Sequence, residues 1–183
     1  MNFAKEDKFR EWLCDKLTSR LPSSDWKVLK GKNVADILIC YQNQARPLLL
    51  FLEVKYYTKK KGRIGISDGK GEGYQVEYLT NKVDYLEKYL QWIIGDQESN
   101  SYLFLTNEEI RRYASAKKIE KGKQNNLSLA QLKTATKKGD IAWLSEQAIL
   151  KRITEWIHSF ADNSDILMPV EKRQAMLDSF YDD

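Results

Sequence analysis

The sequence predicts an α/β fold in which a central mixed sheet has helices on both faces. Two apolar runs, 34–41 and 48–55, are rich in branched and aromatic residues and are separated by polar residues and Pro47, a pattern typical of two strands joined by a turn. Both runs are apolar at successive positions, as expected for strands buried on both faces. Segments with helical periodicity precede and follow them, so helices can cover the two faces of the sheet.

Length and composition favour one well-cored domain. The chain has 183 residues, of which 42% are hydrophobic and 11% aromatic. No apolar run approaches the roughly 18 residues of a membrane helix, and the first residues lack the apolar stretch of a signal peptide. We therefore expect a cytoplasmic protein with no membrane partner. Cys14 and Cys40 have no metal-ligand spacing, which favours core positions over a disulfide or zinc site.

The first predicted element is a helix over residues 4–21, with apolar residues at helical spacing: Phe9, Leu13, Leu17 and Leu21. On a helical wheel Glu6 falls inside this apolar stripe and is directed towards the core. An acid that complements the positive end of the helix dipole is the alternative explanation of Glu6. A short strand is predicted next, over 26–29.

The turn between the two central strands predicts which of their residues face each other. If it is centred between Gln44 and Ala45, the antiparallel register places Asp36 opposite Glu53. Lys55 shares that face, because side chains two apart on a strand point to the same side. Like charges about 4.5–5.5 Å apart repel, and a hard divalent cation between the two carboxylates would remove the conflict.

Asp36 followed by Glu53-x-Lys55 at the end of an apolar strand resembles the PD-(D/E)XK motif of the restriction-endonuclease-like nuclease superfamily. The resemblance covers residues 3–94, with Ala35 in place of the motif's proline. It implies a restriction-endonuclease-like core and a catalytic role for all three charged residues.

The resemblance also implies a metal centre. Asp36 and Glu53 would bind Mg²⁺, with Mn²⁺ able to replace it, and the backbone carbonyl of Val54 would be a further ligand. In nucleases of this fold the first helix often supplies another acid, for which Glu6 is the candidate.

Residues 74–94 show helical periodicity, with Gln75 in the first turn. In several branches of the resembled superfamily a glutamine here orients metal-bound water or phosphate, which implies a catalytic role for Gln75. Solvation of the helix start is the alternative. The spacing Gln75-x-x-Tyr78 differs from the Gln-x-x-x-Tyr of the RecB-like branch.

Residues 56–73 form a glycine-rich, basic segment that is predicted to be a loop beside the metal site. It lacks the Gly-Lys-Ser or Gly-Lys-Thr of a nucleotide-binding loop. Its glycines allow main-chain amides to approach phosphates closely, whereas a solvated connector is the alternative. The candidate DNA contacts in this segment are Lys59, Lys60, Lys61, Arg63 and Lys70.

A second basic segment follows a strand predicted over 101–106 and a helix capped by Thr106 or Asn107. Residues 111–139 contain nine Lys or Arg residues against one acid, a density expected of a nucleic-acid contact. A solvated surface is the alternative. The candidate DNA contacts here are Arg111, Arg112, Lys117, Lys118, Lys121 and Lys123.

Residues 140–144 are expected to add to the sheet and residues 145–160 to form a helix. Near its end, His158 is expected to be a surface or capping residue. The predicted organisation is a single domain over 1–160, with the metal-site core in 3–94 and the basic segment in 111–139. Residues 161–183 are acidic and serve as an interaction tail, a dimer contact or a cover for the basic surface.

The leading hypothesis is a Mg²⁺-dependent endonuclease that hydrolyses phosphodiester bonds of DNA, of restriction or homing type. Because one active site cuts one strand, a double-strand cutter of this size is expected to be a homodimer. A junction-resolving or transposition-associated nuclease uses the same core. The alternative from another class is a nucleic-acid-binding protein without turnover, in which Lys55 and the acids form a structural ion pair.

Overall fold

The computed structural model describes residues 3, 5–31, 34–42, 48–58, 62–66, 75–114, 119 and 125–161. Several predicted DNA contacts lie outside these residues: Lys59, Lys60, Lys61, Lys70, Lys117, Lys118, Lys121 and Lys123. So does the acidic segment from residue 162 onwards.

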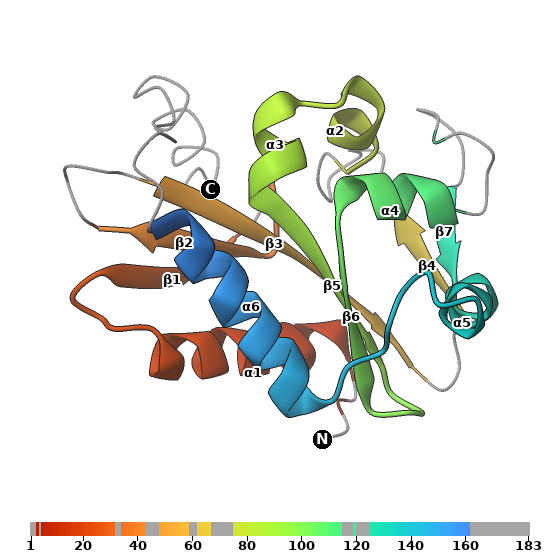
Figure 1. The fold of residues 1–183 in the computed structure, drawn as a ribbon, viewed down its shortest axis with the longest axis horizontal. Helices are drawn as coiled ribbons and strands as arrows, with labels where there is room; N and C mark the ends of the chain where they lie inside the picture. The colour runs from red at the N-terminus through yellow and green to blue at the C-terminus, as the bar shows by residue number, and fades with distance from the viewer. Residues whose placement is uncertain are drawn as a thin grey trace.

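Five strands form the central sheet, in the order β1-β2-β3-β5-β6. They are β1 (Trp26–Lys30), β2 (Ile37–Tyr41), β3 (Leu48–Tyr57), β5 (Leu90–Asp96) and β6 (Ser101–Leu105). β3 and β5 are parallel, and the other neighbours are antiparallel. All positions of the central strand β3 are buried. The predicted α/β fold with a central mixed sheet is confirmed (Figure 1).

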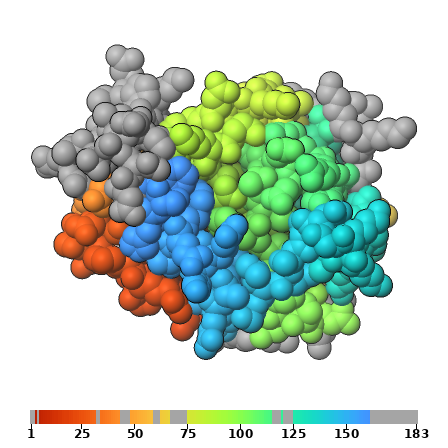
Figure 2. Space-filling view, viewed as in Figure 1, coloured from red at the N-terminus to blue at the C-terminus, as the bar shows by residue number. Residues whose placement is uncertain are grey.

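Helices α1 (Glu6–Arg20) and α6 (Glu146–Ala161) cover one face of the sheet. Tyr102 and Phe104 of β6 point to this face, because residues two apart share a side. Phe9 of α1 stacks on Tyr102, and Trp156 of α6 contacts Phe104 edge to face. Figure 2 shows α6, in blue, at the surface between the N-terminal elements, in red and orange, and the segment around α4, in green.

The opposite face carries α2 (Gln75–Asn81) and α4 (Asn107–Tyr113), with α3 (Asp84–Tyr89) leading into β5. Trp92 of β5 points to this face. Its ring contacts Tyr78 of α2, and its indole N–H donates to Asn107 of α4. In β3, Glu53 pairs with Trp92 of β5, so the Glu53 side chain points to the same face as Trp92. Helices on both faces of the sheet are therefore confirmed.

The predicted register of the β2–β3 hairpin is confirmed. Ile37 pairs with Leu52 and Leu38 with Phe51, the alignment that places Asp36 next to Glu53. β2 begins at Ile37, however, so Asp36 precedes the strand instead of belonging to it.

The single helix predicted over 74–94 is wrong. The structure has two short helices, α2 and α3, and then the strand β5, which begins at Leu90. The helical spacing of Leu90 and Ile93 is coincidental, because every position of β5 is buried. A fully buried strand shows no alternation, so local periodicity does not distinguish it from a buried helix.

The segment 56–73, predicted as a loop, contributes a strand to a small second sheet. Within 56–73 lies β4 (Arg63–Ile66), which pairs with β7 (Asn125–Ser128), and β7 is followed by α5 (Leu129–Lys137). Segments so far apart in sequence pair only when the tertiary fold brings them together, so the local sequence does not predict the pairing. The segment 140–144 does not add a strand to the central sheet, since its contact is one isolated bridge between Leu144 and Tyr102.

Thr106 caps α4 as predicted, in a capping box with Glu109. Within the described part of the chain, none of the helices is both long and apolar enough to cross a membrane.

Gly95→Ala should destabilise the protein. A Cβ at this position would lie 2.6 Å from Cδ2 of Tyr56 and 3.3 Å from the ring of Phe9. The Tyr56 ring is packed among neighbouring aromatic rings, so we expect a loss of about 1–3 kcal/mol in the free energy of unfolding, measured in urea. Gly65→Ala is the control, since a Cβ there meets no atom within 4 Å. Equal stability of the two variants would contradict this account.

Candidate active site

The candidate site is built on an edge of β3 that β2 does not cover. β2 begins at Ile37, opposite Leu52, so the backbone of β3 from Glu53 onwards has no strand on that side within the described residues. Side-chain carboxylates take the place of a strand. Val54 N–H donates to Asp36 Oδ2 at 2.8 Å, and Tyr56 N–H donates to Glu6 Oε2 at 3.0 Å. Both buried amides are thereby paired, as buried backbone groups require.

Glu53 and Lys55 lie on the face of the sheet that α2 covers, next to these two acids. Lys55 Nζ is 2.9 Å from Glu53 Oε1 and 3.8 Å from Glu6 Oε1. Gln75 of α2 donates from Nε2 to Glu53 Oε1 at 2.5 Å. Asp36 acts on the same group, because its carboxylate bonds the Val54 N–H, between Glu53 and Lys55 in β3, and its charge adds to the rise of the Glu53 pKa. We call Glu6, Asp36, Glu53, Lys55 and Gln75 the acidic cluster.

The structure therefore brings together the side chains of all the catalytic and metal-site candidates. The positions of Glu6 and Gln75 bear on the alternatives left open for them, although Glu6 still lies in the first turn of α1, as its helix-dipole alternative requires. Glu6 contacts β3 and Lys55 in addition to lying at the N-terminus of α1, and Gln75 is buried against Glu53 instead of being solvated.

Burial and mutual charge govern the cluster's electrostatics. Glu53 is 3% exposed, and burial raises its pKa to about 8, with the Asp36 charge adding to the rise and Lys55 opposing it. Burial also raises the pKa of Glu6. For Lys55, burial favours the neutral amine, but the charges of Glu53, Glu6 and Asp36 outweigh it and raise the pKa. Lys55 is thus held as an ammonium ion.

Two residues that the sequence reasoning did not select belong to this neighbourhood. Arg10, one turn after Glu6 on α1, donates from Nη1 to Asp36 Oδ1 at 3.0 Å. Tyr78 lies three residues after Gln75, on the same side of α2. Helical spacing, four residues from Glu6 to Arg10 and three from Gln75 to Tyr78, is the sequence signal by which both could have been identified.

The residues present fit a hard divalent cation. Carboxylate oxygens and a backbone carbonyl are the donors that Mg²⁺ takes, and Mg²⁺ usually needs only one or two carboxylates besides water and substrate phosphate. In a strand the N–H and C=O of one residue point to the same edge, so the Val54 carbonyl faces the side of β3 where Asp36 bonds its N–H.

The buried hydroxyl of Tyr78 also indicates a further polar group at this site. It has no hydrogen-bond partner among the described residues, and a buried hydroxyl left in that state is costly. Burial together with the charges of Glu53 and Asp36 raises its pKa. In the present arrangement, however, no three acidic, histidine or cysteine side chains of the described residues converge on one point.

No protein-family model and no curated protein sequence matches the chain. Among solved structures, a nuclease from a fusselovirus is similar to it, with 12% sequence identity and a TM-score of 0.45. The similarity covers 84% of this chain and 89% of that chain.

Among the candidate DNA contacts that the structure describes, some arginines are already held in ion pairs with acids of this chain and others are not described in any. Arg63 is exposed on β4. Arg111 makes a bidentate pair with Glu87, at 2.7 and 2.6 Å, and also donates to a backbone carbonyl. Arg112 pairs with Glu108 at the surface. Arg111 is therefore committed to joining α4 to α3, which leaves it poorly placed for a phosphate.

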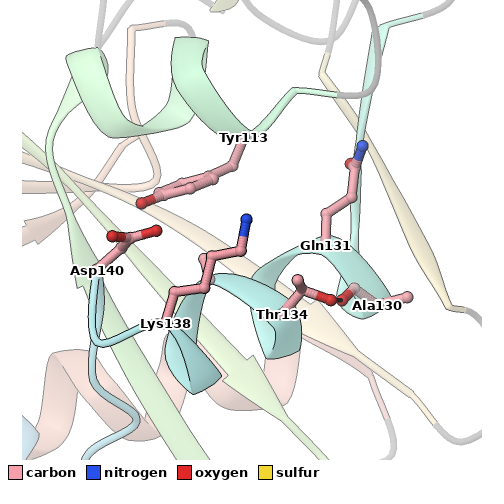
Figure 3. A pocket seen from close by; sticks show the side chains of 7 residues that line it. Tyr113, Ala130, Gln131, Thr134, Lys138 and Asp140 are labelled. Carbon is pink, nitrogen blue, oxygen red and sulfur yellow. Dashed lines mark hydrogen bonds between the residues drawn. The ribbon is translucent and has the colours of Figure 1, made fainter.

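A separate hollow of about 310 Å³ lies between α4 and α5, within the basic segment (Figure 3). The ring of Tyr113 points towards the side chain of Asp140, with Lys138 below it, and Gln131 and Ala130 lie at the far side of the hollow. None of its lining residues belongs to the acidic cluster.

Glu53→Gln should remove a pH dependence from the stability of the metal-free protein. Burial raises the pKa of Glu53 from 4.5 to about 8. The stability linked to this group is then fully present below about 4.5 and lost as the pH rises through about 8. With a chelator present, the free energy of unfolding of the wild type should fall over this window, measured by urea denaturation at several pH values. Parallel profiles for the variant and the wild type would rule Glu53 out as the titrating group.

Proposed function

We propose that this protein is a Mg²⁺-dependent endonuclease that hydrolyses phosphodiester bonds in DNA. The observation that carries the proposal is the grouping of three charged side chains at the uncovered edge of β3. Asp36 bonds the Val54 N–H at 2.8 Å, and the Lys55 ammonium lies 2.9 Å from Glu53. Two acids and an amine are expensive to bury unless they bind something, and this trio matches the PD-(D/E)XK pattern residue by residue.

Each residue has a distinct role in this proposal. Asp36 and Glu53 would hold the cation, together with the Val54 carbonyl and with Glu6 as a further acid. A cation bound there supplies positive charge for the phosphate and makes water more acidic. Lys55, held as an ammonium ion, donates to a non-bridging phosphate oxygen or positions the attacking water. Gln75 fixes the orientation of Glu53 through its hydrogen bond.

The proposal of DNA as the substrate is based on the positive charge of the surface. The exposed Arg63 and the basic residues of 112–139 would supply phosphate contacts, which position DNA without reading its sequence, whereas Arg111 is engaged by Glu87. A single site cuts one strand, so a double-strand break would require two copies, and we propose a homodimer for that case. Linear duplex, supercoiled plasmid and a four-way junction as parallel substrates would separate a restriction or homing enzyme from a junction-resolving one.

A nucleic-acid-binding protein without turnover is the second candidate. The observation in its favour is that Lys55 and Glu53 form a close, buried ion pair, which can serve as a structural contact without a metal ion. Plasmid electrophoresis with and without Mg²⁺ distinguishes the two, because a binding protein retards the plasmid but never nicks it.

Asp36→Asn, Glu53→Gln and Lys55→Met should each lower the rate of plasmid nicking in Mg²⁺ by about 10²-fold or more, because each removes a charge that acts on the phosphate or its cation. DNA affinity, measured by gel retardation, should change little. Lys8→Gln is the control, since Lys8 is exposed and pairs with Glu11 on the outer side of α1. Wild-type nicking by any of the three variants would refute the mechanism.

A further inference from the structure

Arg10 binds the carboxylate that the proposed cation requires. Its guanidinium donates from Nη1 to Asp36 Oδ1 at 3.0 Å and from Nη2 to Asp7 Oδ1 at 3.0 Å. Arg10 lies four residues after Glu6 on α1, so both side chains project from the same side of the helix towards β3. The bond from Arg10 therefore reaches into the acidic cluster from its outer rim.

Both oxygens of Asp36 are engaged, but one partner is a backbone amide of the buried sheet and the other is a partly exposed side chain. Oδ2 accepts from the N–H of Val54 in the buried central strand, and this contact is fixed by the sheet. Oδ1 accepts from Arg10, whose side chain is 29% exposed and also bonds the exposed Asp7. A cation that binds Asp36 at Oδ1 meets the guanidinium at the same oxygen.

The Arg10 guanidinium is also suited to receive an oxyanion. Its Nε is buried and has no hydrogen-bond partner among the described residues. A guanidinium presents its donors in a planar fork that matches phosphate oxygens in a bidentate fashion. Released from Asp36, the Arg10 side chain would have Nε and Nη1 available for a phosphate next to the cluster.

We propose that Arg10 and a divalent cation compete for Asp36, and that a DNA phosphate favours the cation by binding the guanidinium. Arg10 then acts as a positioning residue that couples loading of the cation to the presence of substrate. This inference rests on the proposed function for the identity of the cation and the substrate. It goes further by assigning a role to a residue outside the motif.

Arg10→Gln tests the competition in the absence of DNA. We expect the variant to bind Mg²⁺ or Ca²⁺ about tenfold more tightly than the wild type in isothermal titration calorimetry, because one charge-assisted bond no longer opposes the cation. Arg10→Lys keeps the charge but loses the fork, and its dissociation constant should lie between the two. Circular dichroism and thermal unfolding establish that each variant is folded.

Lys8→Gln is the matched control. It removes the same charge from the same helix, two residues away, but Lys8 contacts Glu11 and not Asp36. A general electrostatic effect would strengthen cation binding equally in both variants, and that result would overturn the proposal. Weaker binding by Arg10→Gln would also overturn it, since Arg10 would then support the site instead of competing for it.

A short DNA duplex in Ca²⁺ tests the coupling. The duplex should tighten Ca²⁺ binding by a larger factor in the wild type than in Arg10→Gln. Only the wild type has a guanidinium that can leave Asp36 and bond a DNA phosphate. Equal factors would contradict the phosphate step. These titrations do not depend on turnover. If the wild type binds the cation as expected but never nicks plasmid, the proposed hydrolysis fails while the competition at Asp36 stands.

Discussion

The site depends on how the uncovered edge of β3 is satisfied. Strand β2 begins only at Ile37, so among the described residues no strand pairs with the buried N–H groups of Val54 and Tyr56 on that side. Asp36 and Glu6 supply carboxylates to these amides. The same backbone requirement that stabilises the fold thus fixes two acids at one edge of the sheet, where their remaining oxygens face Lys55 and Arg10.

Charge balance is the second constraint. Glu6, Asp36 and Glu53 are opposed by two cations, Lys55 and Arg10, which occupy different sides of the group. Lys55 lies deep, next to Glu53, and has a structural as well as a proposed catalytic part. Arg10 lies at the rim, where its side chain is 29% exposed. Burial of negative charge favours either protonation of an acid or the binding of a cation. The raised pKa of Glu53 and the proposed metal centre therefore have the same physical origin.

The sequence predicted the parts of the fold that depend on local patterns. The stripe of α1, the capping box of α4 and the register of the β2–β3 hairpin are all encoded within short stretches, and the structure agrees with each. The same approach failed at β5, whose run of buried residues has no alternation, and at β4 and β7, which pair across about 60 residues of intervening chain. Arg10 was missed because its partner Asp36 lies 26 residues away in the chain, so the contact depends on how α1 packs beside the sheet.

The sequence by itself determined the α/β class, the hairpin register and hence the adjacency of Asp36 and Glu53, because a turn of fixed length aligns the two strands that it joins. Only the tertiary structure decided that Glu6, Arg10 and Gln75 reach the same place. These residues come from helices packed against two different faces of the sheet, and their meeting at the end of β3 depends on where β2 stops. Contacts of that kind follow from packing between distant elements, which no local spacing encodes.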